Sequence, residues 1–200
     1  MNKPNAMFRA AGPAPDSAFL LQHLHDQLRE RMALIKPGTA ITTSVGVLST
    51  ANDVPGELAR IYRDMKPGVF MAAFYGGGTL AELRTSLLAA EAAVTGCSAL
   101  RVAPTIAASS TLQLMQRAGF ADPVVDSDVT TMTYATPDDL VADLRAANMT
   151  GVLATTHFLP RTVWKEAVTY YQKNFGDTRA RCTATFETIF LTGWKNQQPQ

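Results

Sequence analysis

The fold is predicted most clearly by residues 53–91, which read DVPGELARIYRDMKPGVFMAAFYGGGTLAELRTSLLAAE. Asp53 and Pro55 are typical of a helix N-terminus, and apolar residues then recur at helical spacing until a Lys-Pro-Gly sequence ends the helix. The apolar run 69–75 that follows is typical of a strand buried on both faces, as in a parallel sheet. A helix followed by a doubly buried strand predicts an α/β domain.

The alternation of helix and strand extends toward the N-terminus. Apolar spacing predicts a first helix over residues 17–35, and the β-branched run ITTSVGVL predicts a strand over residues 41–48. This strand, the helix after Asp53 and the strand 69–75 form a βαβ unit, which requires a right-handed crossover between parallel strands. Glycines 76–78 end the second strand, and we expect Thr79 to cap the next helix.

The C-terminal half continues in the same manner. The patterns predict helices that begin at Thr111, at Pro137 and directly after Leu159-Pro160, and strands over residues 123–134 and 183–194. We expect three parts of the chain: a disordered leader over residues 1–15, one domain over residues 16–194 and a polar tail over residues 195–200.

Composition and charge exclude several classes of function. Lys and Arg total 18 against 17 Asp and Glu, and a formal net charge of +1 does not favour binding to nucleic acid. No apolar run reaches the length of about 20 residues that a membrane helix needs. The only two cysteines, Cys97 and Cys182, lack metal-ligand spacing, which favours free thiols in a reducing compartment. The leader has basic residues and no acid before Asp16, which suits either a mitochondrial presequence or an untargeted segment.

Few residues qualify as candidates for a ligand or catalytic site. Gly76, Gly77 and Gly78 form either a backbone-lined ligand loop at the end of a parallel strand or an ordinary strand-to-helix turn. Ser49 and Thr50 follow a strand and serve either a pocket or a turn. Asp126 and Asp128 point the same way on a predicted strand, where they form either an acid–base pair or two solvated charges. His23 and His25 point to different faces of a predicted helix and cannot share a metal.

Residues 53–91 resemble the class I S-adenosylmethionine-dependent methyltransferases, in the branch of malonyl-acyl-carrier-protein methyltransferase and the mitochondrial complex I assembly factor. Gly77-Gly78-Thr79-Leu80 and Glu82-Leu83-Arg84 match the pattern that follows the fifth strand in that branch, with Gly78 where an acidic residue can stand. Later stretches fit the same branch: Arg101-Val102 with Pro104, LMQRAGFADPVVDSD (114–128) and TFETIFLTGW (185–194). The resemblance covers residues 53–194.

The resemblance implies a truncated Rossmann-like methyltransferase fold, with equivalents of strands four to seven, flanking helices on both faces and an antiparallel last strand. The family binds S-adenosylmethionine at a Gly-rich turn after its first strand and at an acidic residue after its second strand. The chain contains neither feature, so the resemblance implies that the cofactor-binding half is absent. We therefore expect no cofactor to bind the isolated chain.

Two functions are compatible with this pattern. The first is a degenerate, non-catalytic family member that acts as an assembly or interaction subunit, as in mitochondrial complex I assembly. The second is a methyltransferase whose cofactor-binding half is supplied by another chain or is missing from the gene model. Resemblance to the complex I factor favours the mitochondrial matrix, with the bacterial cytoplasm as the alternative.

The missing strands would leave the strand 41–48 at a sheet edge. This strand contains no charge and no proline, the features that normally protect an edge from pairing with another chain. The first helix could cover part of the edge; otherwise we expect a protein partner or a second copy of the chain to pair there. The predicted partner-binding residues are Ile41, Thr43, Val45 and Val47.

Overall fold

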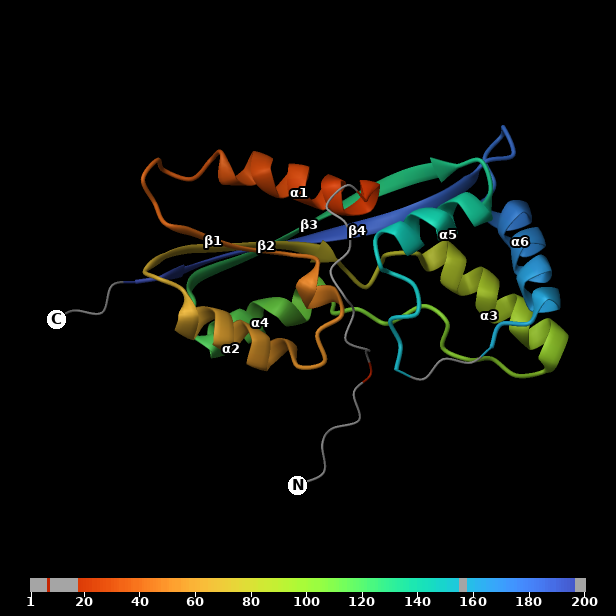
Figure 1. The fold of residues 1–200 in the computed structure, drawn as a ribbon, viewed down its shortest axis with the longest axis horizontal. Coiled ribbons are helices and arrows are strands. Elements are labelled where there is room, and N and C mark those ends of the chain that lie inside the picture. Colours follow the sequence, from red (N-terminus) through yellow and green to blue (C-terminus); the bar gives the residue numbers. More distant parts are fainter. Residues whose placement is uncertain (1–6, 8–17, 155–157, 197–200) are drawn as a thin grey trace, which may run out of the picture. The chain divides into compact units, whose positions relative to one another are not determined.

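The computed structural model describes Met7, residues 18–154 and residues 158–196 (Figure 1). The predicted leader, apart from Met7, and most of the predicted tail lie outside the described residues. The elements, in chain order, are α1 (Phe19–Met32), β1 (Ile41–Val45), a short 3-10 helix η1 (Val47–Ser49), α2 (Val54–Asp64), β2 (Gly68–Tyr75), α3 (Ala81–Thr95), α4 (Ala108–Ala118), β3 (Ala121–Tyr134), α5 (Pro137–Ala146), α6 (Arg161–Phe175) and β4 (Cys182–Lys195).

The four strands form one mixed sheet in the order β1-β2-β4-β3. β1 and β2 are parallel and in register from Ile41 opposite Val69 to Val45 opposite Ala73, which confirms the predicted βαβ unit. β4 runs antiparallel to β2, as the resemblance implied for the last strand. The predicted α/β class is therefore confirmed as a four-stranded mixed sheet with flanking helices.

Tertiary contacts divide the chain into two compact units, and β3 and β4 contribute residues to both. The unit that we call the sheet unit comprises the described residues within 19–77, 105–128 and 187–200. The unit that we call the helical unit comprises the described residues within 1–18, 78–104 and 129–186. One domain over residues 16–194 stays a prediction.

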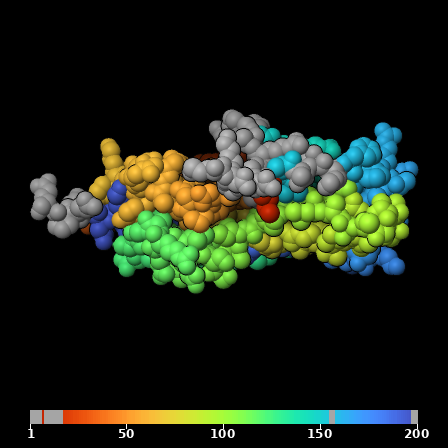
Figure 2. All heavy atoms as spheres, turned by 90° about the horizontal axis from the view of Figure 1, so that it is seen from below, coloured from red at the N-terminus to blue at the C-terminus, as the bar shows by residue number. Residues whose placement is uncertain are grey.

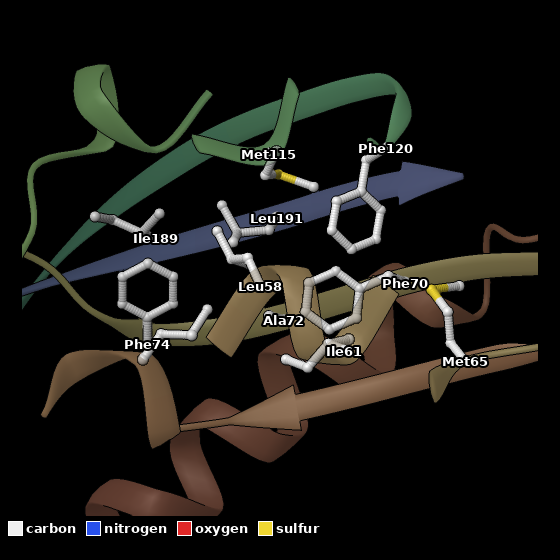
Figure 3. Close-up of a cluster of buried hydrophobic side chains, with 11 residues drawn as sticks. Leu58, Ile61, Met65, Phe70, Ala72, Phe74, Met115, Phe120, Ile189 and Leu191 are labelled. Atoms are coloured by element: carbon white, nitrogen blue, oxygen red, sulfur yellow. The ribbon is translucent and has the colours of Figure 1, made fainter. Parts of the chain in front are cut away.

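The core of the sheet unit is built around β2, in which every residue from Val69 to Tyr75 is buried. α1 covers one face of the sheet, while α2 and α4 lie side by side on the other face (Figures 1 and 2). Between β2 and these last two helices lies a cluster of buried side chains that includes Phe70, Phe74, Leu58, Met115, Phe120, Ile189 and Leu191 (Figure 3). Each fully buried side chain of this size stabilises the fold by about 1.5–3 kcal/mol.

The helical unit is held together by α3 and α6, which pack side by side (Figure 2). α6 buries Val163, Ala167 and Tyr171, and the Tyr171 hydroxyl donates to the backbone oxygen of Thr183 at 2.7 Å. α5 begins with a capping box in which Thr136 accepts from the backbone N–H of Asp139, which explains why the predicted helix starts at Pro137. No helix among the described residues has the length and apolar character needed to cross a membrane.

Four local predictions were wrong in detail. The strand predicted to reach Leu48 ends at Val45, because Gly46 adopts left-handed backbone (φ 74°) and turns the chain into η1. Leu80, not Thr79, is the N-cap of α3, and its N–H is fixed by a 2.8 Å hydrogen bond to the Thr185 oxygen. Two helix bounds also differ, since α4 begins at Ala108 rather than at Thr111, and α1 ends at Met32 rather than at residue 35.

Candidate functional site

Ser49, a predicted site residue, lies beside the C-terminal end of β2. Its hydroxyl accepts a hydrogen bond from the Tyr75 N–H at 3.1 Å and donates to the Tyr75 oxygen at 3.3 Å. Thr50 follows as the C-cap of η1, where its N–H donates to the Val47 oxygen at 3.4 Å. Both backbone groups of Tyr75 are thus bound by one side chain, which favours a structural role for Ser49 at the end of the strand pair.

The glycines after β2 lie close against β4. The Gly76 N–H donates to the Glu187 oxygen at 2.8 Å, and a Cβ at Gly76 would lie 2.6 Å from Cδ1 of Ile189 and 2.8 Å from Oε2 of Glu187. A Cβ at Gly77 would lie 3.5 Å from the Thr105 oxygen, an ordinary van der Waals distance. Close packing against β4 accounts for Gly76, and a cofactor role for Gly76, Gly77 and Gly78 stays a prediction.

Asp126 and Asp128 lie together on β3, as their spacing predicted, but their partner is Arg31 at the end of α1. Arg31 Nη2 lies 3.0 Å from Asp126 Oδ2 and 2.7 Å from Asp128 Oδ2. Its guanidinium also lies 3.4 Å from the centre of the Phe190 ring. Partial burial opposes the charge of Arg31, but the hydrogen bonds to Asp128 and Asp126 outweigh it and raise its pKa. Arg31 therefore anchors α1 on β3 through the carboxylates and on β4 through Phe190, a role for the aspartates that the sequence did not indicate.

β1 is an edge strand, since β2 is its only strand neighbour among the described residues. The Ala40 oxygen accepts from the Val69 N–H and the Gly46 N–H donates to the Ala73 oxygen, both at 2.9 Å. Backbone groups alternate in direction along a strand, so the residues between these two that point away from β2 are Ile41, Thr43 and Val45. Within the described part of the chain, Ile41, Thr43 and Val45 therefore turn backbone groups to a side of β1 that has no strand neighbour. Val47 lies in η1, outside the strand, and a partner-binding role for all four residues stays a prediction.

The first helix contacts both β1 and β2. α1 buries Leu20, Leu24 and Leu28, and the Tyr75 hydroxyl donates to the Leu20 oxygen at 2.9 Å. At its other end, Arg31 reaches β3 and β4. α1 therefore lies over one face of the sheet, where Tyr75 ties it to β2 and the two aspartates tie it to β3.

The helical unit contains a cavity of about 450 Å³ that the sequence did not indicate. α3, α5, the first turn of α6 and the segments 100–103 and 149–153 form its walls. Its lining residues are spread over five segments without a motif, so only the fold brings them together. No group of three or more metal-ligating side chains occurs within the described ranges, and both cysteines are free.

Known proteins similar to this chain are methyltransferase-like. The mitochondrial arginine-hydroxylase NDUFAF5 of zebrafish (Danio rerio) is 32% identical over 151 residues, which cover 74% of this chain and 47% of that protein. The malonyl-[acyl-carrier protein] O-methyltransferase of Halorhodospira halophila is 32% identical over 155 residues, covering 74% of this chain and 49% of that protein. A solved structure of a putative methyltransferase from Bacillus halodurans is 14% identical with a TM-score of 0.46, covering 82% of this chain and 68% of that one.

The chain spans about half the length of the curated relatives that it matches. No family model matches it. These relatives confirm the predicted resemblance to the branch of malonyl-acyl-carrier-protein methyltransferase and the mitochondrial factor. That resemblance rests on residues between 53 and 194.

Proposed function

The chain belongs to the S-adenosylmethionine methyltransferase-like family, and we propose that it acts as a non-catalytic interaction subunit that pairs with another chain through the edge of β1. The observation that carries the proposal is the row of outward N–H and C=O groups of Ile41, Thr43 and Val45. Backbone groups at an unprotected edge are a template for an added strand. In the absence of another partner, a second copy of the chain fills this position.

The side chains of β1 also favour pairing. ITTSV contains the β-branched residues Ile, Thr and Val, and it has no charged residue and no proline. This composition has a high strand propensity. Thr43 is exposed, whereas the other four residues are half-buried, so an added strand would cover an edge that the sheet already holds in register. Rigid pre-organisation of this kind reduces the entropic cost of association.

A pair of proline substitutions tests the proposal. Proline removes a backbone N–H, so Thr43→Pro removes a donor that faces outward, while Thr42→Pro removes one that faces β2. We expect Thr43→Pro to keep the fold and to weaken self-association, measured by light scattering over a range of concentrations. We expect Thr42→Pro to destabilise the sheet itself, measured by urea unfolding. A wild-type chain that stays monomeric at every concentration, with slow amide exchange at Thr43, would contradict the proposal.

The proposed setting is the mitochondrial matrix, in a role like that of a complex I assembly factor. The mitochondrial relative supports this setting, and the bacterial methyltransferase supports the bacterial cytoplasm as the alternative. Fractionation of cells that express a tagged full-length protein distinguishes the two. Recovery of the protein from the cytosol of a eukaryotic cell would contradict a matrix function.

A second candidate is a methyltransferase whose cofactor-binding half comes from another chain or from coding sequence outside this one. The observation that favours it is the match to about half of a methyltransferase. Under the first proposal, calorimetric titration of the 200-residue chain with S-adenosylmethionine gives no saturable heat at micromolar concentrations. Binding that appears only after a second polypeptide is added would favour the second candidate.

A further inference from the structure

The cavity of the helical unit is lined mostly by apolar side chains. Its aliphatic lining includes Leu80, Leu83 and Leu87 around α3, Leu144 of α5 and Leu153. The indole of Trp164, in the first turn of α6, adds an aromatic surface. A volume of about 450 Å³ lies within the range of roughly 300–1,000 Å³ that is typical of small-molecule sites.

One arginine of the cavity is neutralised by a buried partner. Arg101 forms an ion pair with Glu91, and the side chains are only 12% and 7% exposed. The same guanidinium donates to the Phe158 oxygen at 3.2 Å, while Glu91 Oε2 also accepts from the Ala99 N–H at 2.8 Å. Arg101 is therefore a fixed part of the wall, and its charge is balanced within the protein.

Two further arginines of the cavity have no charged partner among the described residues. Arg145 lies in the last turn of α5 and Arg161 is the first residue of α6, and both line the cavity and are exposed. Within the part of the chain that the structure describes, neither side chain forms an ion pair or a hydrogen bond. The one acidic lining residue, Asp138, accepts from the Trp164 indole N–H at 3.1 Å. Arg145 and Arg161 together outweigh Asp138, so the cavity has a positive excess.

We propose that this cavity binds a small amphipathic anion, with a carboxylate, phosphate or sulfonate head and an aliphatic or aromatic body. Arg145 and Arg161 bind the head through charge-assisted hydrogen bonds, for which the guanidinium fork is well suited. The leucines and Trp164 contact the body, which leaves water as it enters the cavity. The site goes beyond the proposed function, since its residues all belong to the helical unit and those of the β1 edge to the sheet unit.

Decanoate is a suitable probe, because it combines one carboxylate with an aliphatic body. Trp164 lines the cavity and the chain has only one other tryptophan, so the Trp194→Phe background reports binding through the fluorescence of Trp164. We expect saturable binding of decanoate to the full chain. We expect decanamide, the neutral analogue, and inorganic phosphate, a head without a body, each to bind at least about tenfold more weakly.

Matched arginine variants test the role of charge. Arg145→Met combined with Arg161→Met keeps the aliphatic length and removes both charges, and we expect at least about a tenfold loss of decanoate affinity. Arg117→Met removes an exposed arginine of α4 in the sheet unit and should leave the affinity unchanged. Circular dichroism checks that each variant is folded. Absence of saturable binding to the wild type, equal binding of decanamide, or equal affinity in the double variant would each overturn the proposal.

The same titration separates this site from the β1 edge. Thr43→Pro should leave decanoate affinity unchanged, because β1 contributes no lining residue. Failure of self-association together with normal decanoate binding would refute the proposed function alone. Normal self-association without decanoate binding would refute the cavity proposal alone.

Discussion

The two edges of the sheet, β1 and β3, differ in how they are protected against pairing. Within the sheet unit, β3 carries Pro123, a left-handed residue at Asp122 (φ 45°), and the carboxylates of Asp126 and Asp128. β1 carries none of these features. Charge, proline and local distortion are the usual means by which proteins prevent edge-to-edge association. One edge thus carries protective features that the other lacks, which supports the proposal that β1 is the edge used for binding.

The buried centre of the sheet, and not its edges, contributes most to the stability of the fold. Phe74 of β2 is fully buried in the cluster with Ile189 and Leu191. We expect Phe74→Ala to lower the free energy of unfolding by about 3–5 kcal/mol, since it removes buried surface and leaves a cavity. Urea unfolding measures the change. Thr43→Ala on the exposed side of β1 is the control, with an expected change within about 0.5 kcal/mol.

The elements were predictable from the sequence because their ends carry local signals. Pro55 with the Asp53 cap, and the Thr136 capping box, mark the starts of α2 and α5 at the predicted positions. The end of β1 was missed, because a glycine inside a β-branched run does not reveal that it is left-handed. The position of β1 at the edge of the sheet was predicted from the strand order of the family, and not from the sequence pattern of residues 41–48.

Contacts between residues far apart in the chain could not be predicted from the sequence. Arg31 and Asp126 are 95 residues apart, and each alone looks like a solvated surface charge. Arg145 and Arg161 likewise line one cavity only because α5 and α6 border it. Periodicity and caps describe neighbours along the chain, so sites assembled from distant segments require the fold.

A charged residue on β1, which has none, should weaken pairing at its edge. Thr43 is exposed, so Thr43→Lys places a solvated cation beside the outward backbone groups with little strain. We expect self-association to weaken at least about tenfold, or about 1.4 kcal/mol, measured by sedimentation velocity. Gln116→Lys adds the same charge on the exposed side of α4 and should change association little. Equal losses in both variants would indicate a general charge effect and contradict the role of the edge.

The smallest effect is expected at the protected edge, where Arg31 anchors α1. The Arg31 side chain is 25% exposed, while those of Asp126 and Asp128 are 60% and 51% exposed, so solvent weakens both ion pairs. Arg31→Met keeps an aliphatic side chain over Phe190 and removes the charge, and we expect a loss of about 1 kcal/mol in urea unfolding at low salt. The loss should shrink near 1 M salt, where screening acts within about 3 Å. Arg29→Met removes a more exposed pair with Asp26 and should cost almost nothing, so equal effects of the two substitutions would show that α1 is not anchored at β3.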